Sequence, residues 1–264
     1  MALTFDGSTE YLSASVALVS ARPITMCGWV RPETKQSNAI LTLIESADAG
    51  GMSNTSGYMS VGPGRYGRMD MFWAKQRTSA ASYPLYGSSS GVATSTWFHM
   101  VAQVLANNSR ELFVDGSSVG SATAGGYTSD IASADTLYIG HVGVTSGHGI
   151  SGLQGNKTVD GGIAEVAIWD IQLTANQISA LAAGFSPLLI RPDKLLGYWP
   201  LGGPYAHATA YIDVVGGNTL AQTGSMDATN LEQHPPIIYP TSPTVITGGV
   251  IAAPIPILAS GMCT

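Results

Sequence analysis

The stretch 162–181 constrains the fold most, because it joins the signature of a sheet strand to that of a short helix. Its first half is an almost unbroken apolar run, which predicts a β-strand. A regular strand would place Ile163, Glu165, Ala167 and Trp169 on one face and Ala164, Val166, Ile168 and Asp170 on the other. Thr174 and Gln177 have the spacing of a capping box, and Gly184 is suited to end the helix. An apolar strand that leads into one short helix favours a β-sandwich with a helical connection.

The same stretch resembles the closing strand and helix of laminin-G-like, concanavalin-A-type jelly rolls. Five further segments match that family in order: residues 3–12 as the opening strand, 24–30 as the core tryptophan strand, 96–102 as a central strand, and 112–116 and 137–140. The resemblance implies an all-β, concanavalin-A-like (laminin-G-like) antiparallel β-sandwich jelly roll with one short helix and an extended C-terminal arm. Because the functions of this family are diverse, the fold alone implies no activity.

Composition excludes two classes of partner. The net charge is -6, and only 11 Lys and Arg are spread over 264 residues, so we expect no nucleic-acid partner. No segment has the apolar length of a membrane helix, and the first strand begins within three residues, leaving no room for a secretory signal. We therefore expect a protein that is made in the cytoplasm and has no membrane partner.

Two segments rich in Gly, Ser, Ala and Thr, 45–67 and 74–95, predict long loops around a strand at 68–73. Loop ends of sandwiches often carry binding sites. Four aromatic residues in or beside these and later loops are candidates for stacking on a sugar: Trp73, Tyr83, Tyr86 and Tyr127. The alternative is that they fill the core or anchor the loops.

Residues 195–224 resemble a segment that precedes the opening strand in many relatives, yet here they follow the helix. We expect them to close the sandwich beside residues 3–12, as in a circular permutant. Asp213 and Asn218 match a family position that sometimes binds calcium, and Asp6 would lie near them. Many relatives carry an acidic residue at the position of Ala164, and its absence here weakens the resemblance to a calcium site. The alternative is that Asp213 and Asn218 belong to a solvated turn. Calcium is the one cofactor that the resemblance suggests.

The sequence predicts no enzyme. Glycoside hydrolases of the superfamily carry Glu-x-Asp-x-x-Glu along one strand, whereas here Glu165 is followed by Ala167 and Asp170. In a regular strand Glu165 and Asp170 point to opposite faces. A glycoside hydrolase with a divergent site is kept as a third alternative.

The cysteines and histidines give no catalytic motif. Cys27 is expected to be a buried thiol and Cys263 a free thiol near the C-terminus. His99 is expected to be hydrogen-bonded within the sandwich, and His234 to lie on the surface.

The C-terminal segment 233–264 is the second informative feature. From Pro235 onward it has no charged residue, and proline recurs along it. Recurrent proline favours an extended arm, which we expect to follow a sandwich formed by residues 1–232. Its apolar residues would be a liability if exposed, so we expect them to contact another subunit. The expected interface residues are Pro235, Pro236, Ile237, Tyr239, Val250, Ile251, Pro254 and Ile255. The alternative is that the arm wraps back over its own sandwich.

Together these features favour a non-enzymatic structural protein of a virion, of the capsid-decoration or head-fibre type, from a tailed bacteriophage. Its partners would be other virion subunits, with homo-oligomers expected. The alternative is a lectin, either associated with a phage tail or on a cell surface, that binds a host glycan.

Overall fold

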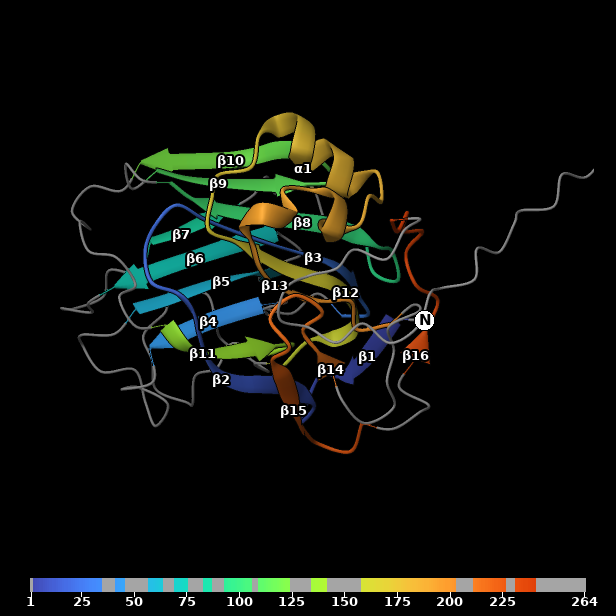
Figure 1. Ribbon diagram of the computed structural model, residues 1–264. Helices are drawn as coiled ribbons and strands as arrows, with labels where there is room; N and C mark the ends of the chain where they lie inside the picture. The colour runs from blue at the N-terminus through green and yellow to red at the C-terminus, as the bar shows by residue number, and fades with distance from the viewer. Residues whose placement is uncertain are drawn as a thin grey trace, which may run out of the picture.

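Two antiparallel sheets of eight strands each form a sandwich in the computed structural model (Figure 1). The structure describes residues 2–34, 41–45, 57–63, 69–75, 83–86, 93–105, 109–123, 134–141, 158–202, 211–226 and 231–240. This architecture confirms the antiparallel sandwich that the sequence predicts. Within these ranges no helix is long and apolar enough to cross a lipid bilayer.

The sheet order brings strands far apart in sequence side by side. Sheet A runs β10 (Ser117–Thr123), β9 (Ser109–Val114), β8 (Phe98–Val104), β3 (Ile24–Pro32), β12 (Asp160–Trp169), β1 (Ala2–Asp6) and β16 (Leu231–Glu232), with β13 (Leu195–Trp199) also paired to β12. Sheet B runs β14 (Tyr211–Ile212), β15 (Thr219–Thr223), β2 (Tyr11–Val19), β11 (Ala134–Ile139), β4 (Leu41–Glu45), β5 (Gly57–Pro63), β6 (Met69–Lys75) and β7 (Tyr83–Tyr86).

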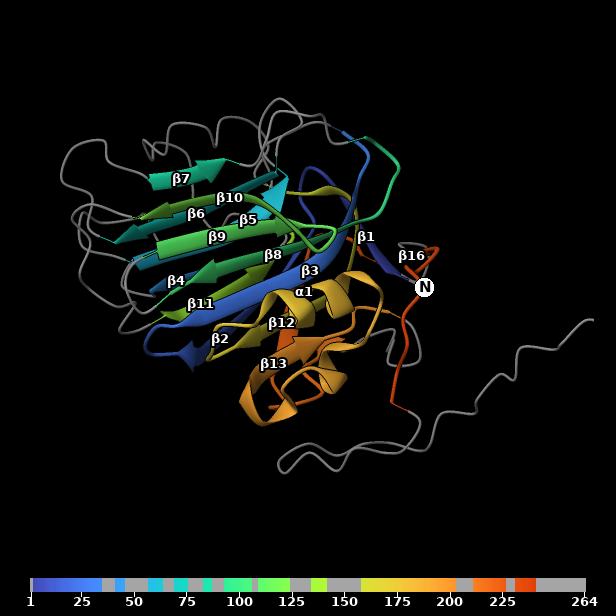
Figure 2. The same ribbon diagram turned by 90° about the horizontal axis from the view of Figure 1, so that it is seen from above.

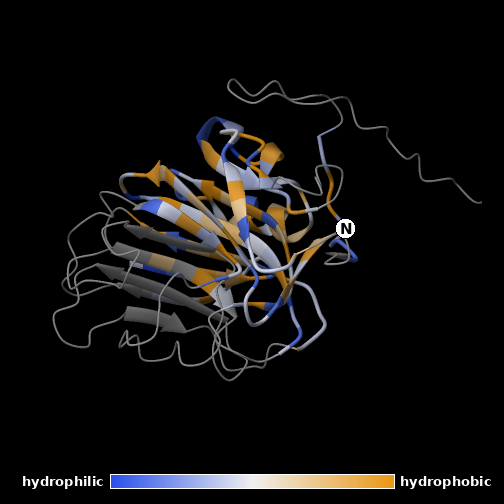
Figure 3. Ribbon diagram, turned by 90° about the horizontal axis from the view of Figure 1, so that it is seen from below, coloured by the Kyte–Doolittle hydropathy of each residue, from blue (hydrophilic) through white to orange (hydrophobic). Residues whose placement is uncertain are grey.

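The core lies between the sheets because apolar residues recur at every second position of the facing strands. Figure 3 shows hydrophobic residues recurring among polar ones along the described strands. Leu12 and Leu137 of sheet B meet Met26 and Trp199 of sheet A in one buried cluster. A second cluster lies on the other face of sheet A, where α1 (Ala175–Ala182) packs through Ile178. Figure 2 shows α1 lying over this face of sheet A.

Strand β12 is not regular, and the alternation predicted for it is wrong. The register with β3 shifts between Ala164 and Ala167, as in a β-bulge. Ile163 therefore joins the core cluster with Val166 and Ile168, although a regular strand would put it on the opposite face. A bulge adds one residue to a strand and reverses the facing of every residue on one side of it.

The helix is capped as its sequence predicts. The Thr174 side chain accepts a hydrogen bond from the Gln177 backbone N–H, and the Gln177 side chain accepts one from the Thr174 N–H, so the capping box is confirmed. At the other end Gly184 adopts a φ of 91°, its N–H donates to Leu181 O, and the Phe185 N–H donates to Ala180 O. These two bonds form a Schellman motif, which glycine favours.

The two loops expected at 45–67 and 74–95 contain strands, so that prediction is wrong in part. β5 occupies 57–63 and β7 occupies 83–86, on either side of the expected strand, now β6. Met59 and Val61 of β5 are fully buried two positions apart. A high content of Gly and Ser concealed this alternation, because packing outweighs the weak β-propensity of these residues.

The segment 195–224 contacts both sheets. β13 pairs with β12, and β15 pairs with β2, with Thr223 opposite Tyr11 and Gln222 opposite Leu12. The chain therefore adds β15 beside the second strand and β13 in line with β1. A bridge between Ala2 and Gly202 links the first strand to the residues that follow β13.

His99 is more isolated than expected. It is 1% exposed, its ring lies 5.2 Å from that of Trp29, and within the described part of the chain its Nδ1 has no hydrogen-bond partner. The expectation of a hydrogen-bonded histidine is therefore wrong for this nitrogen. Burial lowers the pKa of His99 from 6.5 to about 3, because a charged imidazolium would lose its hydration.

Replacing the helix cap tests the local prediction. We expect Thr174→Ala to lower the free energy of unfolding by about 1 kcal/mol, because one N–H of the first turn loses its acceptor. Thr174→Ser keeps the hydroxyl and should stay within a few tenths of a kcal/mol of the wild type. Urea unfolding followed by circular dichroism measures both, and equal losses in the two variants would contradict a role for the cap.

The buried histidine predicts a stability that falls in acid. Between pH 6.5 and 3 the unfolded chain binds a proton at His99 that the folded chain does not, so stability drops as pH falls, by at most about 1.4 kcal/mol per pH unit. His99→Leu cannot titrate, so its stability relative to the wild type should rise steadily from pH 7 to pH 4. Parallel curves of unfolding free energy against pH for the two proteins would contradict this assignment.

Candidate functional site

Glu165 is the most unusual residue of the described chain, because a carboxylate lies inside an apolar strand. It is 1% exposed and sits at the bulge of β12 with a φ of 57°. The first part of β12 pairs with β1, and its last part pairs with β13. Glu165 lies between these two paired parts. Its N–H donates to Pro200 O at 3.0 Å. A non-glycine residue in this left-handed conformation is uncommon and costs about 1 kcal/mol or more.

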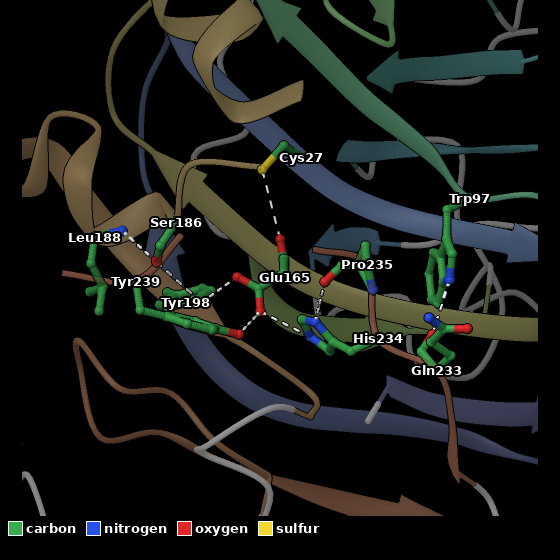
Figure 4. A network of polar contacts seen from close by, with 10 residues as sticks. All are labelled: Cys27, Trp97, Glu165, Ser186, Leu188, Tyr198, Gln233, His234, Pro235 and Tyr239. Atoms are coloured by element: carbon green, nitrogen blue, oxygen red, sulfur yellow. Dashed lines mark hydrogen bonds and ion pairs between the residues drawn. The ribbon is translucent and has the colours of Figure 1, made fainter. Parts of the chain in front are cut away.

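The carboxylate of Glu165 receives hydrogen bonds from two tyrosines (Figure 4). Tyr239 Oη donates to Oε1 at 2.8 Å, and Tyr198 Oη donates to Oε2. His234 Nε2 lies 3.2 Å from Oε1, close enough for an ion pair when protonated but without the alignment of a hydrogen bond. The expectation that His234 lies on the surface is wrong, since only 12% of its side chain is exposed. A buried carboxylate surrounded by donors is a stable arrangement.

Burial and the Glu165 charge raise the pKa of two neighbouring side chains, Tyr198 and Cys27. Burial first and the Glu165 carboxylate second raise the pKa of Tyr198 well above 10, so its hydroxyl stays protonated and remains a donor. The same two causes, in the same order, raise the pKa of Cys27. The Cys27 thiol lies 3.9 Å from the Glu165 backbone O and is fully buried, which confirms the expectation of a buried free thiol.

The donor Tyr239 and the neighbouring His234 come from the start of the C-terminal arm. We call residues 233–240 the arm root. Its backbone is held by Ile238, whose N–H donates to Gly184 O at 2.7 Å and whose O accepts from the Ser186 N–H at 3.0 Å. Trp97 Nε1 donates to Gln233 O at 3.1 Å at its beginning (Figure 4). The arm root is therefore bound to the sandwich at three places.

The arm root lies on its own sandwich, as in the second alternative of the sequence analysis. Among the expected interface residues, Pro235 is buried and Tyr239 is half-buried, whereas Pro236 is exposed and Ile237 is partly exposed. The others, Val250, Ile251, Pro254 and Ile255, lie outside the described residues, as does Cys263. A contact of the arm with another subunit stays a prediction for the residues beyond Pro240.

The calcium candidate Asp213 already accepts hydrogen bonds from its own turn and from β13. Asp213 Oδ1 accepts from the N–H groups of Tyr198 and Val215, each at 2.9 Å, and Oδ2 accepts from Asn218 Nδ2 at 2.9 Å. The structure thus brings Asn218 to Asp213, and both serve to hold the turn before β15. Within the described ranges no group of three His, Cys, Asp or Glu is arranged to hold a metal ion. Calcium stays a prediction.

Asp6 caps the turn between β1 and β2. Its Oδ1 accepts from the N–H groups of Ser8, Thr9 and Glu10 at 2.8 to 3.0 Å. Burial raises the pKa of Asp6, but these N–H donors lower it more, so the net pKa is below its usual range. The described bonds of Asp6 serve its own turn, and none joins it to Asp213.

Three of the four aromatic candidates for sugar stacking lie on one sheet edge. Trp73 of β6 is directly opposite Tyr83 of β7, and Asp70 is opposite Tyr86. β7 is the last strand of sheet B. The fourth, Tyr127, lies outside the described residues.

Glu165 and Asp170, the two carboxylates that the sequence analysis compared, are not arranged to act together on a glycosidic bond. Glu165 is buried and bonded to two tyrosines, whereas the Asp170 side chain is 44% exposed and lies 3.9 Å from Lys194 Nζ. Two such carboxyl groups would have to flank one substrate bond from both sides. Glu165 acts here as an anchor for Tyr198 and the arm root.

Comparison with known families agrees with the sandwich. A laminin G domain family, described as the concanavalin A-like lectin/glucanases superfamily, matches residues 6–179. The chain belongs to this superfamily. The fold class predicted from the sequence, a concanavalin-A-like sandwich, is thereby confirmed. No curated protein sequence matches the chain.

Solved structures of the superfamily are similar to this chain in fold. A heptameric SAP-like pentraxin from Limulus polyphemus is 18% identical over 68% of this chain and 80% of its own, with a TM-score of 0.50. A Bacteroides ovatus protein to which carbohydrate binding is attributed is 15% identical over 86% of this chain and 61% of its own, with a TM-score of 0.51. Tailspike protein 2 of Escherichia coli O157:H7 bacteriophage CAB120 has a TM-score of 0.48 at 13% identity, over 75% of this chain and 26% of its own.

Sequence reasoning missed Tyr198 and His234 as partners of Glu165. The available signal was the carboxylate itself, because a Glu inside an apolar strand requires donors from elsewhere in the chain. The tyrosine of the apolar run 195–199 was a candidate donor, but no local pattern links it to Glu165, 33 residues earlier.

Removing one donor tests whether Glu165 fastens the arm root. We expect Tyr239→Phe to lower the free energy of unfolding by about 1–2 kcal/mol and to speed protease cleavage within residues 233–240, because a buried carboxylate loses a donor. Ile238→Ala is the matched control, since its side chain is 51% exposed and its two bonds come from the backbone. Limited proteolysis with mass spectrometry measures both, and equal cleavage rates in the two variants would contradict this role.

Proposed function

We propose that this protein is a non-enzymatic structural protein of a larger assembly, in which a lectin-type sandwich is displayed and residues 241–264 attach it to other subunits. The assembly we propose is a virion, with the protein as a capsid decoration or head fibre. Its partners would be other virion subunits, either capsid or tail proteins, and further copies of the same chain.

The arm root is the observation that carries this proposal. Backbone bonds to Ile238, the bond from Trp97 and the Tyr239–Glu165 bond fix residues 233–240 on the sandwich. The described part of the arm is therefore held on the sandwich as far as Pro240. The 24 residues that follow carry no charge and contain many Ile, Val, Leu, Ala and Pro. An uncharged apolar segment that starts from a fixed point suits a tether that is buried between subunits.

The absence of enzymatic activity is supported by the engagement of Glu165. Its carboxylate oxygens are both occupied by tyrosine hydroxyls, and the side chain is 1% exposed. A general acid or base must reach the substrate proton within hydrogen-bond distance. This carboxylate cannot do so while the arm root is in place.

Carbohydrate binding is the second candidate function. Membership of the superfamily is consistent with it, and carbohydrate binding is attributed to the Bacteroides ovatus protein of similar fold. The specific observation in its favour is that the strand register pairs Trp73 with Tyr83 in the last two strands of sheet B. This function is compatible with a displayed sandwich.

Two truncations separate the tether from its root. A chain ending at Pro240 keeps every described contact of the arm root, whereas a chain ending at Glu232 also loses Tyr239, one of the two donors to Glu165. We expect the first to unfold at the same urea concentration as the full chain but to lose self-association and binding to purified particles. We expect the second to be less stable as well.

Mass in solution by light scattering and co-sedimentation with particles measure these outcomes. Unchanged association of the chain ending at Pro240 would overturn the tether. Comparing the chain that ends at Glu232 with the chain that ends at Pro240 shows how much stability the arm root contributes.

A further inference from the structure

Three aromatic rings gather at one end of sheet B, apart from the arm root and from β6 and β7. The rings of Tyr11 and His141 are stacked, with centroids 4.6 Å apart and planes 25° apart. The ring of Tyr138 completes the cluster, 5.9 Å from that of Tyr11 and 5.7 Å from that of His141. All three residues are partly exposed. The cluster therefore reaches the protein surface.

Strand register places this cluster on the outer face of sheet B. The neighbours in sequence, Leu12, Leu137 and Ile139, are fully buried in the core between the sheets. Successive residues of a strand point to opposite faces, so Tyr11 and Tyr138 point outward. Figure 1 shows β15, β2 and β11 side by side.

The described positions of β2 and β15 beside the cluster carry no charge and include several hydroxyl groups. Tyr11 is opposite Thr223, and Ser13 lies between Ala221 of β15 and Tyr138 of β11. The outward positions that follow along β2 and β15 are exposed and also carry no charge: Ser15, Ala17 and Thr219. Together these residues present aromatic rings beside small hydroxyl-bearing side chains.

We propose that this face, centred on Tyr11, Tyr138 and His141, is a binding site for a neutral carbohydrate. One face of a pyranose ring carries C–H groups that pack against an aromatic ring, and its rim carries hydroxyls that bond to groups such as Ser13, Thr223 and the tyrosine hydroxyls. The proposal rests on the second candidate function, carbohydrate binding, and gives it a site other than Trp73, Tyr83, Tyr86 and Tyr127.

Charge decides the class of ligand. A nucleic acid or an acidic sugar would need Lys or Arg to neutralise it, and the described side chains of this face include none. Burial first and Tyr11 second raise the pKa of Tyr138, so its hydroxyl stays neutral at physiological pH. A neutral glycan matches a surface of rings and hydroxyls without charge.

The opposite face of the sandwich is partly covered. The helix α1 lies over the outer face of sheet A near β3 and β12 (Figure 2), with Ile178 packed against that sheet, and Tyr239 of the arm root is bonded to Glu165 of β12. A ligand on sheet B would therefore leave the arm root undisturbed.

The test uses the full chain on an array of neutral gluco-, galacto-, manno- and xylo-oligosaccharides, followed by titration calorimetry with the best binder. We expect Tyr11→Leu and Tyr138→Leu to weaken binding at least about tenfold, because leucine keeps apolar volume but has no ring. Tyr11→Phe keeps the ring and should stay within a few-fold of the wild type. Unchanged urea unfolding midpoints show that the variants are folded.

Trp73→Ala distinguishes the two sites. If this variant loses binding while Tyr11→Leu keeps it, the proposed face is overturned and carbohydrate binding stands at β6 and β7. If the wild type binds no oligosaccharide on the array, both the face and the second candidate function are overturned. Neither result bears on the tether, which the truncations test.

Discussion

A buried carboxylate must be surrounded by donors, and in this protein that requirement joins three distant parts of the chain. Glu165 sits in a central strand of sheet A, and its donors come from Tyr198, 33 residues later, and Tyr239, 74 residues later. The Tyr198 strand and the arm root are thus fastened to the same charge. Removing either partner leaves the carboxylate with a missing donor, so the packing of β13 and that of the arm root depend on each other.

The bulge in β12 is the backbone counterpart of that requirement. In a regular strand Glu165 would alternate with Ala164 and Val166, and the apolar residues on one side of it would face the wrong way. The extra residue restores Ile163, Val166 and Ile168 to one core and turns Glu165 to the side where Tyr198 stands. The bulge also lies between the part of β12 that pairs with β1 and the part that pairs with β13. It therefore interrupts neither of these two ladders. The positive φ of Glu165 is tolerated because contacts on both sides fix it.

Local patterns in the sequence predict much of this fold, whereas the Glu165 site depends on long-range contacts. The capping box of Thr174 and Gln177 follows from spacing within a few residues, and the order of the strand motifs follows from the resemblance to the family; the structure bears out both. No local rule places Glu165 at a positive φ, because that conformation is common for glycine and rare for glutamate. The donors of Glu165 lie too far along the chain for periodicity to link them. His234 was misplaced for the same reason, since its burial comes from the fold around Glu165.

The outer faces of the two sheets differ in the contacts that the structure describes. Sheet A buries part of its outer face under α1, and the arm root is bonded to Glu165 of the same sheet. On sheet B the outward residues of β2 and β15 stay exposed and uncharged beside the rings of Tyr11, Tyr138 and His141. A tether that begins on one sheet and a ligand surface on the other do not compete for area. Because the Tyr239–Glu165 bond lies at sheet A, a glycan bound at Tyr11 and Tyr138 on sheet B would leave the arm root in place.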